Sequence, residues 1–315
     1  MKVFVAGATG VVGRRAVKLL SRAGNQVTAV ARNPESARLV EELGATAVGV
    51  DLFDPESVRG AVVGQEAVIN LATKIPPLLL AALPGAWREN NRIRSVASRN
   101  LVDGALAEGA GRYLQESFAP IYPDRGAGWI DEGAQVAPAQ YVQSVLEAEH
   151  QTERFTAAGG IGVILRFGLF YGPDGSHMET TLRLARFGIS TVVGPPETYM
   201  SSITTDDAAT AVVAALGAPA GTYNVVDNEP VTRRQYIDAF AQALRLPRLR
   251  ILPAWLAGLG GSKARMLMRS QRVSNLRLRE ATSWSPAYPS AIEGWHKVVA
   301  QLPDAASRSG PVNRR

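Results

Sequence analysis

The sequence predicts an α/β protein built on a doubly wound parallel sheet. Short apolar runs alternate with helix-like segments through the first half of the chain. The runs are almost continuously apolar, which is typical of strands covered on both faces. A glycine-rich turn, GATGVVG at residues 7–13, directly follows the first run. Because strand–helix–strand units cross over with a right hand, this alternation predicts helices on both sides of one sheet.

The expected elements follow one another in a regular order. The second helix, for example, has Pro34 in its first turn and Gly44 just past its end. The first four strands are expected at residues 2–7, 26–32, 45–51 and 67–73, with helices at 11–24, 34–44 and 54–64 between them. Later elements are expected at 88–109 (helix), 111–117 (strand), about 139–158 (long helix), 162–170 (strand) and 221–227 (returning strand).

Composition narrows the class of protein. The chain has 315 residues, of which 46% are apolar and 20% charged, and no apolar run is long enough to cross a membrane. Cysteine is absent and the three histidines are dispersed, so no metal site is expected. We expect a cytoplasmic protein with a small-molecule substrate and without a membrane or nucleic-acid partner.

The net charge of +6 comes from scattered arginines and very few lysines. The densest basic run, residues 265–280, alternates with Leu, Met and Val at helix-like spacing. We interpret it as the solvated face of an amphipathic helix. The alternative is a basic groove that receives an anionic ligand.

The turn at residues 7–13 is the strongest functional signal. It lies between a strand and a helix, which is the context that a dinucleotide-binding turn requires. Gly7 permits a tight turn, Gly10 lets the backbone approach a pyrophosphate, and Gly13 lets the helix pack on the strand. The free N–H groups and the positive end of the helix would hold the phosphates. The residues expected around them are Gly7, Thr9, Gly10, Val11, Val12 and Gly13.

The ends of the next three strands would complete this site, because ligands collect at the carboxyl ends of parallel strands. Arg32 closes the second strand, where an acidic residue would favour NAD, and its guanidinium can pair with the 2′-phosphate of NADP. Asp51 and Leu52 would meet the adenine. Ala72 and Thr73 would run beside the ribose and the nicotinamide. NADP(H) is therefore the preferred cofactor, with NAD(H) as the alternative.

The character of the chain changes after YGPDG, at residues 171–175. Loops, proline pairs and short helices there predict a small C-terminal substrate-binding lobe. We expect a dinucleotide-binding domain at residues 1–170 with a returning segment at about 202–228, and the substrate-facing lobe at about 171–201 and 229–304. The polar tail at 305–315 is expected to be disordered.

These stretches resemble the short-chain dehydrogenase/reductase superfamily, in particular its extended or atypical branch of NAD(P)-dependent epimerase/dehydratase-like proteins. The likeness rests on the glycine turn, on LRFGLFYGPDG (165–175) and on SSITTDDAATAVVAAL (201–216), and it covers about residues 1–300. The resemblance implies a Rossmann fold and catalysis by Ser or Thr, Tyr and Lys. Relatives often dimerise through two helices beside strands four and five, so a homodimer is expected from the resemblance alone.

The family's catalytic set is incomplete in this sequence. Tyr141 stands where the family's Tyr begins a helix, but the Lys position four residues later is Val145. The hydroxyl position falls on Phe118, with Ser117 one residue earlier. A phenol with an unperturbed pKa of about 10 is a poor base at neutral pH. Lys74, directly after the fourth strand, is a candidate substitute because it lies near the expected nicotinamide end.

Three functions fit this pattern. The first is an NADP(H)-dependent reductase or isomerase that acts on a carbonyl of a small molecule, with Tyr141 or water as the acid, since a neutral phenol already carries the proton. The second is a non-redox dehydration, cyclisation or epimerisation in the same pocket. The third is an NADP(H)-binding sensor or partner protein. The second lobe favours the first function, and the apolar segment 78–87 could cap a site for a small apolar substrate.

Overall fold

Seven parallel strands form the central sheet of the computed structural model, which describes residues 1–76, 83, 85–175, 177–252 and 265–302. The strand order is β12-β7-β5-β4-β1-β2-β3. The strands are β1 (Lys2–Ala6), β2 (Gln26–Val30), β3 (Thr46–Val48), β4 (Ala67–Asn70), β5 (Arg112–Phe118), β7 (Ile161–Phe167) and β12 (Gly221–Val225). The order reverses between β1 and β4, so the doubly wound sheet is confirmed, with its switch point between these two strands.

Helices cover both faces of the sheet. One face carries α1 (Gly13–Arg22), α2 (Pro34–Glu42), α8 (Thr205–Ala215) and α12 (Leu276–Thr282), and the other carries α3 (Pro55–Val62), α5 (Ser98–Ala107) and α6 (Ser144–Ala157). Successive side chains of β1 point to opposite faces of the sheet, so they contact different sets of helices. Val3 and Val5 pack with the first set, and Phe4 and Ala6 with the second. All four side chains are fully buried, as the apolar strand composition predicts.

The predicted helix at 88–109 is a continuous run with an irregular centre. It comprises α4 (Arg88–Arg92), the π-helical turn η1 (Ile93–Ala97) and α5. A π-helical turn inside an α-helix frequently lies at a functional site. Here it places Arg94 against Glu116 of β5, with the guanidinium 2.9 Å from both carboxylate oxygens.

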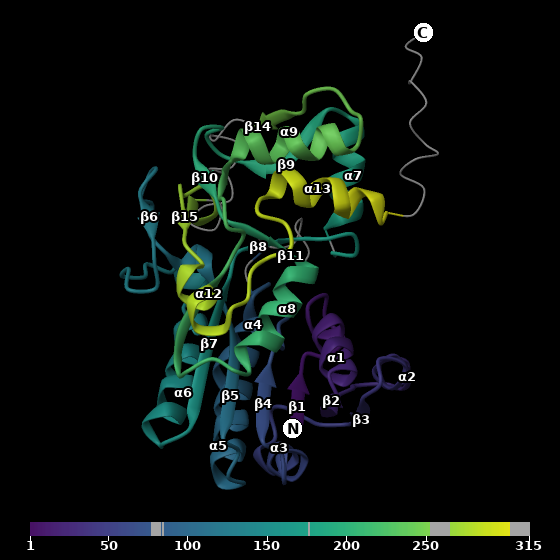
Figure 1. Cartoon of the computed structure of the whole chain (residues 1–315), viewed down its shortest axis with the longest axis vertical. Helices are drawn as coiled ribbons and strands as arrows, with labels where there is room; N and C mark the ends of the chain where they lie inside the picture. Colours follow the sequence, from purple (N-terminus) through teal and green to yellow (C-terminus); the bar gives the residue numbers. More distant parts are fainter. Residues whose placement is uncertain (77–82, 84, 176, 253–264, 303–315) are drawn as a thin grey trace.

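A second hydrophobic cluster lies beyond the sheet and is drawn above it in Figure 1. Its elements are α7 (Met178–Arg186), β9 (Ile189–Val193), β10 (Tyr199–Met200), β13 (Val231–Thr232), α9 (Arg233–Ala243), β14 (Arg250–Leu252) and α13 (Ala291–Ala300). Trp295 lies at its centre, with ring centroids 5.0 Å from Tyr171, 5.4 Å from Tyr236 and 4.5 Å from Phe240. Leu278 and Trp284, within the range expected for this lobe, pack instead against the sheet.

Short strands and turns join the two parts. β8 (Leu169–Tyr171) pairs with β11 (Ser202–Thr204), and β6 (Trp129–Ile130) pairs with β15 (Arg272–Val273). Single turns of 3₁₀-helix, η2 (Ala119–Ile121) and η3 (Gln140–Val142), follow β5 and precede α6.

Two details of the sequence prediction are wrong. The long helix begins at Ser144, so Tyr141 lies in the separate turn η3 and not on α6 itself. The basic run at 265–280 is not one amphipathic helix, because it contains β15 and buried Ser270 and Gln271 before α12 begins. The expected tail at 305–315 and most of the apolar segment at 78–87 lie outside the described residues.

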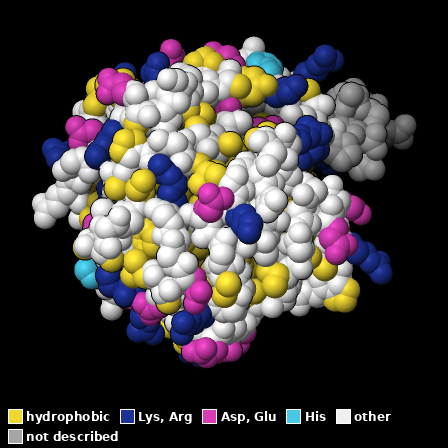
Figure 2. Space-filling model, turned by 60° about the horizontal axis from the view of Figure 1, so that its bottom comes forward, with side chains coloured by type: hydrophobic (Ala, Val, Ile, Leu, Met, Phe, Trp, Pro, Cys, Tyr) yellow, Lys and Arg dark blue, Asp and Glu magenta, His cyan; other side chains and the backbone are white. Residues whose placement is uncertain are grey.

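The surface mixes both signs of charge. On the face shown in Figure 2, Lys and Arg side chains are interspersed with Asp and Glu, so the positive net charge forms no single patch on that face. Among the described residues, no helix is both long enough and apolar enough to span a membrane. No group of three or more His, Asp or Glu within the described ranges could hold a metal ion.

Candidate functional site

The glycine turn lies at the switch point of the sheet. Gly7 follows β1 with a φ of +81°, and a Cβ there would overlap the backbone of Leu71 and Ala72, just after β4. A Cβ on Gly13 would overlap the carbonyl oxygen of Gly7. The Gly10 N–H donates to that same oxygen at 3.1 Å. Only glycine therefore lets the two strand ends and the first turn of α1 come this close together.

The start of α1 is suited to an anion. Its N-cap residue Val12 makes no side-chain capping hydrogen bond, and no acidic residue stands in the first turn. Gly10 is exposed beside it, and Thr9 and Val11 are half-buried. The amide groups and the positive end of an uncapped helix attract phosphate. This cradle and the uncapped helix fit the pyrophosphate of a dinucleotide.

Two arginines hold the first turn of α1 against distant segments. Arg14 pairs with Asp174 in the loop after β8. Arg15 pairs with Asp174 at 2.9 Å and with Asp206 of α8 at 2.5 Å, and it donates to the Val11 carbonyl at 2.8 Å. The sequence prediction missed this cluster, because no motif connects residues so far apart along the chain.

Most of the residues predicted to bind the adenine end of the cofactor are exposed. The Arg32 side chain reaches solvent just after β2, while its backbone N–H donates to Ser36 Oγ at 3.1 Å. Asp51 is also exposed, and its Oδ1 accepts from the Phe53 N–H at 2.9 Å. Leu52 is half-buried. The Arg32 guanidinium has no ion pair with any described residue, and it lies at the edge where a 2′-phosphate is expected.

The loop after β4 is fixed by two asparagines. The Ala72 N–H donates to Asn70 Oδ1 at 3.1 Å, and the Lys74 N–H donates to Asn90 Oδ1 at 2.9 Å. Thr73 between them is exposed. The Lys74 ammonium lies 3.4 Å from a carboxylate oxygen of Glu89, and both side chains are about half exposed. Lys74 thus has an acidic partner in Glu89, at the start of α4.

Tyr141 is half-buried in an apolar setting close to the end of β5. Its ring packs edge-on against Trp87 with centroids 4.9 Å apart. Burial raises the pKa of its phenol to about 12, and the positive charge of Arg269 opposes that shift. Val145 is only 1% exposed and lies in the same cluster. The place of the family's lysine is therefore filled by a core side chain.

Ser117 belongs to a different environment. Its hydroxyl donates to Glu149 of α6, and Glu149 accepts two hydrogen bonds from Arg166 of β7 at 2.7 and 2.8 Å. Arg166 also donates to the Tyr122 hydroxyl at 2.8 Å, which donates to Asn224 at 2.9 Å. The structure thus ties Ser117 into a buried polar network and does not bring its hydroxyl together with Tyr141.

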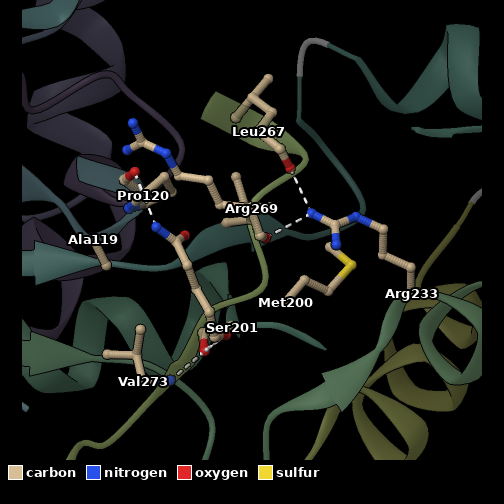
Figure 3. A pocket seen from close by; sticks show the side chains of 10 residues that line it. Ala119, Pro120, Met200, Ser201, Arg233, Leu267, Arg269 and Val273 are labelled. Carbon is tan, nitrogen blue, oxygen red and sulfur yellow. Dashed lines mark hydrogen bonds between the residues drawn. The ribbon is translucent and has the colours of Figure 1, made fainter. Parts of the chain in front are cut away.

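A small cavity, shown in Figure 3, lies between the sheet and the second hydrophobic cluster, and it is lined in part by Arg269, whose charge acts on Tyr141. Its lining residues come from the end of β5, from β8, β10 and α9 and from the segment before α12. They are Ala119, Pro120, Leu169, Met200, Ser201, Arg233, Leu267, Arg269, Gln271 and Val273. The sequence prediction missed Arg233 altogether. It noticed Arg269 only within the basic run, and the helix interpretation placed that run on the surface.

A parallel doubly wound sheet with a glycine cradle and an uncapped helix at its switch point defines a Rossmann-type dinucleotide-binding protein. Residues 7–219 match the family described as NAD(P)H-binding. The chain belongs to this family, within the extended branch of the short-chain dehydrogenase/reductases.

Three known proteins illustrate the relationship. A Streptomyces protein named 3-diazoavenalumate denitrifying reductase is 32% identical over 306 residues, covering 93% of this chain and 99% of that one. The 2-alkyl-3-oxoalkanoate reductase of Shewanella oneidensis is 27% identical over 269 residues, covering 78% and 66%. The crystal structure of human epimerase family protein SDR39U1 with NADPH superposes with a TM-score of 0.78 at 21% identity, covering 96% and 100%. The last likeness confirms the fold.

Proposed function

We propose that this protein is an NAD(P)H-dependent reductase of a small molecule, in which Tyr141 donates the proton. The observation that carries the proposal is the Tyr141 phenol, whose burial raises its pKa to about 12. The charge of Arg269, a residue of the cavity lining, acts on it, and buried Val145 stands at the position of the family's lysine. Two relatives support the reaction class, because they are named as reductases of 3-diazoavenalumate and of 2-alkyl-3-oxoalkanoate.

The cofactor would be held by the strand ends described above. The amides of the turn at 7–13 would bind the pyrophosphate, Arg32 would select NADP(H) through the 2′-phosphate, and Asp51 and Leu52 would face the adenine. Ala72 and Thr73 would lie along the ribose and nicotinamide. When bound, the reduced cofactor supplies a hydride to the substrate.

Tyr141 suits proton donation better than proton removal. A phenol with a pKa of about 12 keeps its proton throughout the neutral range. It can therefore protonate an oxygen or nitrogen that gains electrons during reduction. The phenolate left behind would be stabilised by the charge of Arg269, which already favours the ionised form of Tyr141. Arg269 would thus take part of the role that the resemblance assigns to a lysine at position 145.

The other expectations remain predictions. Lys74 is proposed to act on the substrate or the ribose only if it leaves Glu89, and Ser117 only if its hydroxyl leaves Glu149. The substrate-facing role of the second lobe, a homodimer and a cytoplasmic location are likewise predicted and await a test.

Consumption of NADPH with a panel of aldehydes, ketones and oxo acids tests the proposal. Tyr141→Phe should lower turnover by about 100-fold or more, which is the usual contribution of a general acid. Tyr288→Phe is the matched control, because Tyr288 lies in the loop before α13, away from the cavity lining. It should turn over like the unchanged protein.

The alternative functions give different results. A non-redox dehydratase or epimerase would form product without net NADPH consumption. A sensor would bind NADPH and convert nothing in the panel. Either result, or normal turnover by Tyr141→Phe, would overturn the proposed role of Tyr141.

A further inference from the structure

Among the described residues that line the interlobe cavity, two are positively charged and none is negatively charged. Its volume is about 10 Å³, room for about one water molecule. Six of its lining residues are apolar, two are neutral and polar, and the remaining two are Arg233 and Arg269. Of the two arginines, Arg233 is buried, and a buried charge is normally paired.

Arg233 begins α9 and is only 2% exposed. Its guanidinium donates to the carbonyl oxygens of Leu267 at 2.6 Å and Arg269 at 3.0 Å, and to the hydroxyl of Thr198. The first two bonds are drawn in Figure 3. All three acceptors are neutral. Burial accordingly lowers the pKa of Arg233 to about 10.

The other buried arginines each have a carboxylate partner, so the surroundings of Arg233 are an exception. Three arginines are buried in the described part of the chain. Arg94 pairs with Glu116 and Arg166 with Glu149. Arg233 has no carboxylate within ion-pair distance among the described residues. Its neighbour Arg234, on the same helix, does have one in Asp238.

Arg269 also lines the cavity, and its side chain is half-buried. Its guanidinium donates to the carbonyls of Tyr122 at 3.0 Å and Ala137 at 2.8 Å, which are again neutral. Among the described residues, the negative charge of Asp124 acts on both arginines and raises the pKa of each, so the two arginines share one carboxylate. Its two carboxylate oxygens already accept backbone N–H groups, from Gly126 at 3.0 Å and Ser270 at 2.9 Å.

We infer that this cavity is the subsite for a carboxylate of the substrate, with Arg233 and Arg269 supplying the balancing positive charge. The volume admits about one water-sized group, so one carboxylate oxygen would enter it in place of a water and the rest of the ligand would stay outside. Since Arg269 also acts electrostatically on Tyr141, the carboxylate would lie near the group that is reduced. The substrate class is then a small oxo acid or a similar carboxylate. The reduction itself rests on the proposed function, whereas the anion subsite does not.

Binding of simple probes tests this inference. Benzoate, benzamide and phenyl phosphate are titrated into the full-length protein, with and without NADP⁺, at constant ionic strength by calorimetry. Benzoate should bind at least about tenfold more tightly than benzamide, a difference of about 1.4 kcal/mol, and more tightly than phenyl phosphate. Arg269→Gln and Arg233→Gln should each remove most of the preference. Arg234→Gln should keep it, because Arg234 lies outside the cavity lining and already has Asp238.

Arg233→Gln also removes hydrogen bonds that hold the segment before β15, so its folding is checked by thermal melting. If Arg233→Gln does not fold, Arg233→Lys and Arg269→Gln are used instead. Arg233→Lys keeps the positive charge and should keep the preference for benzoate, whereas Arg269→Gln should lose most of it. Equal binding of benzoate and benzamide, no binding of either, tighter binding of phenyl phosphate, or a preference that survives Arg269→Gln would overturn the inference. Benzoate selectivity without NADPH consumption by any carbonyl compound would instead overturn the proposed reductase and leave the anion subsite standing.

Discussion

The glycine turn and the surroundings of Tyr141 are built in opposite ways. The turn comes from seven consecutive residues, and its requirements are those of the backbone: a positive φ at Gly7 and no Cβ at Gly13. The surroundings of Tyr141 come from the residue just before α4, from η2, η3 and α6, and from the segment before β15, and they depend on side-chain burial and charge. A requirement of the local backbone produces a motif that can be recognised in the sequence. A site assembled from distant segments produces no such motif.

The difference also concerns what each region can tolerate. The turn resembles that of many dinucleotide-binding proteins because the ligand's phosphates impose one geometry. Around Tyr141, buried Val145 stands where the resemblance expects a lysine, and the positive charge that acts on the phenol is that of Arg269, from a distant segment. Proton transfer can be served by several charge arrangements, so such a region need not keep one motif.

Val145→Lys should have the largest effect on stability. It tests whether the site lacks only the family's lysine. Val145 is 1% exposed among Ile121, Val142 and Met266, so an ammonium there would be an unpaired buried charge. The free energy of unfolding in urea should fall by about 3 kcal/mol or more. Gln143→Lys, at an exposed position nearby, should stay close to the unchanged protein. A stable Val145→Lys variant with raised activity would show that the site accepts the family's ordinary chemistry.

Gly13→Ala should come next, because the new Cβ would overlap the Gly7 carbonyl oxygen. The overlap should cost about 2 kcal/mol in the free energy of unfolding and displace the phosphate cradle. NADPH binding by calorimetry should then weaken by about 100-fold. Gly60→Ala is the control, since Gly60 also lies in a helix but has nothing within 4 Å of its Cβ position. Unchanged NADPH affinity in Gly13→Ala would refute the phosphate cradle.

Arg32→Glu tests the predicted binding site at the adenine end of the cofactor. If Arg32 pairs with the 2′-phosphate, the ratio of NADPH affinity to NADH affinity should drop by about tenfold or more, since this bond is charge-assisted. Arg38→Glu, an exposed position on α2, changes the net charge equally and should leave the ratio unchanged. Equal ratios in the two variants would remove Arg32 from the site.

Lys74→Gln should have the smallest effect. Lys74 pairs with Glu89 on the surface, and such pairs contribute about 0–1 kcal/mol. Turnover and melting temperature should both stay close to those of the unchanged protein. A large loss of turnover with normal NADPH binding would restore Lys74 as the substitute for the missing ammonium.

Much of the fold could be predicted from the sequence because it depends on local patterns. Buried strands such as β1 read as apolar runs, and proline and glycine mark the bounds of helices such as α2. Strand ends were predicted too long: β3 covers only Thr46–Val48, since ladder pairing and not apolar composition decides where a strand stops. The cofactor turn was predictable for the same local reason.

The rest of the site was hidden from the sequence. Asp174 and Asp206 reach Arg15 only through the fold, and Ser117 is turned into a network with Glu149 and Arg166 that no spacing indicates. The unbalanced charge of Arg233 can be recognised only once its neighbours are known. Whether a buried charge has a partner depends on tertiary packing, which cannot be read from a single sequence.

The pH dependence of hydride transfer tests most directly whether Tyr141 is a neutral acid. The rate of NADPH oxidation in a single turnover is measured from about pH 6 to pH 9 for the unchanged protein and for Tyr141→Phe. Because burial raises the pKa of the phenol to about 12, Tyr141 stays protonated over this range. The rate should be flat with pH and about 100-fold lower in Tyr141→Phe at every pH. A rate that falls as pH rises through this range and matches that of Tyr141→Phe at its upper end would mean that Tyr141 loses its proton there, and equal rates at every pH would mean that it never donates one.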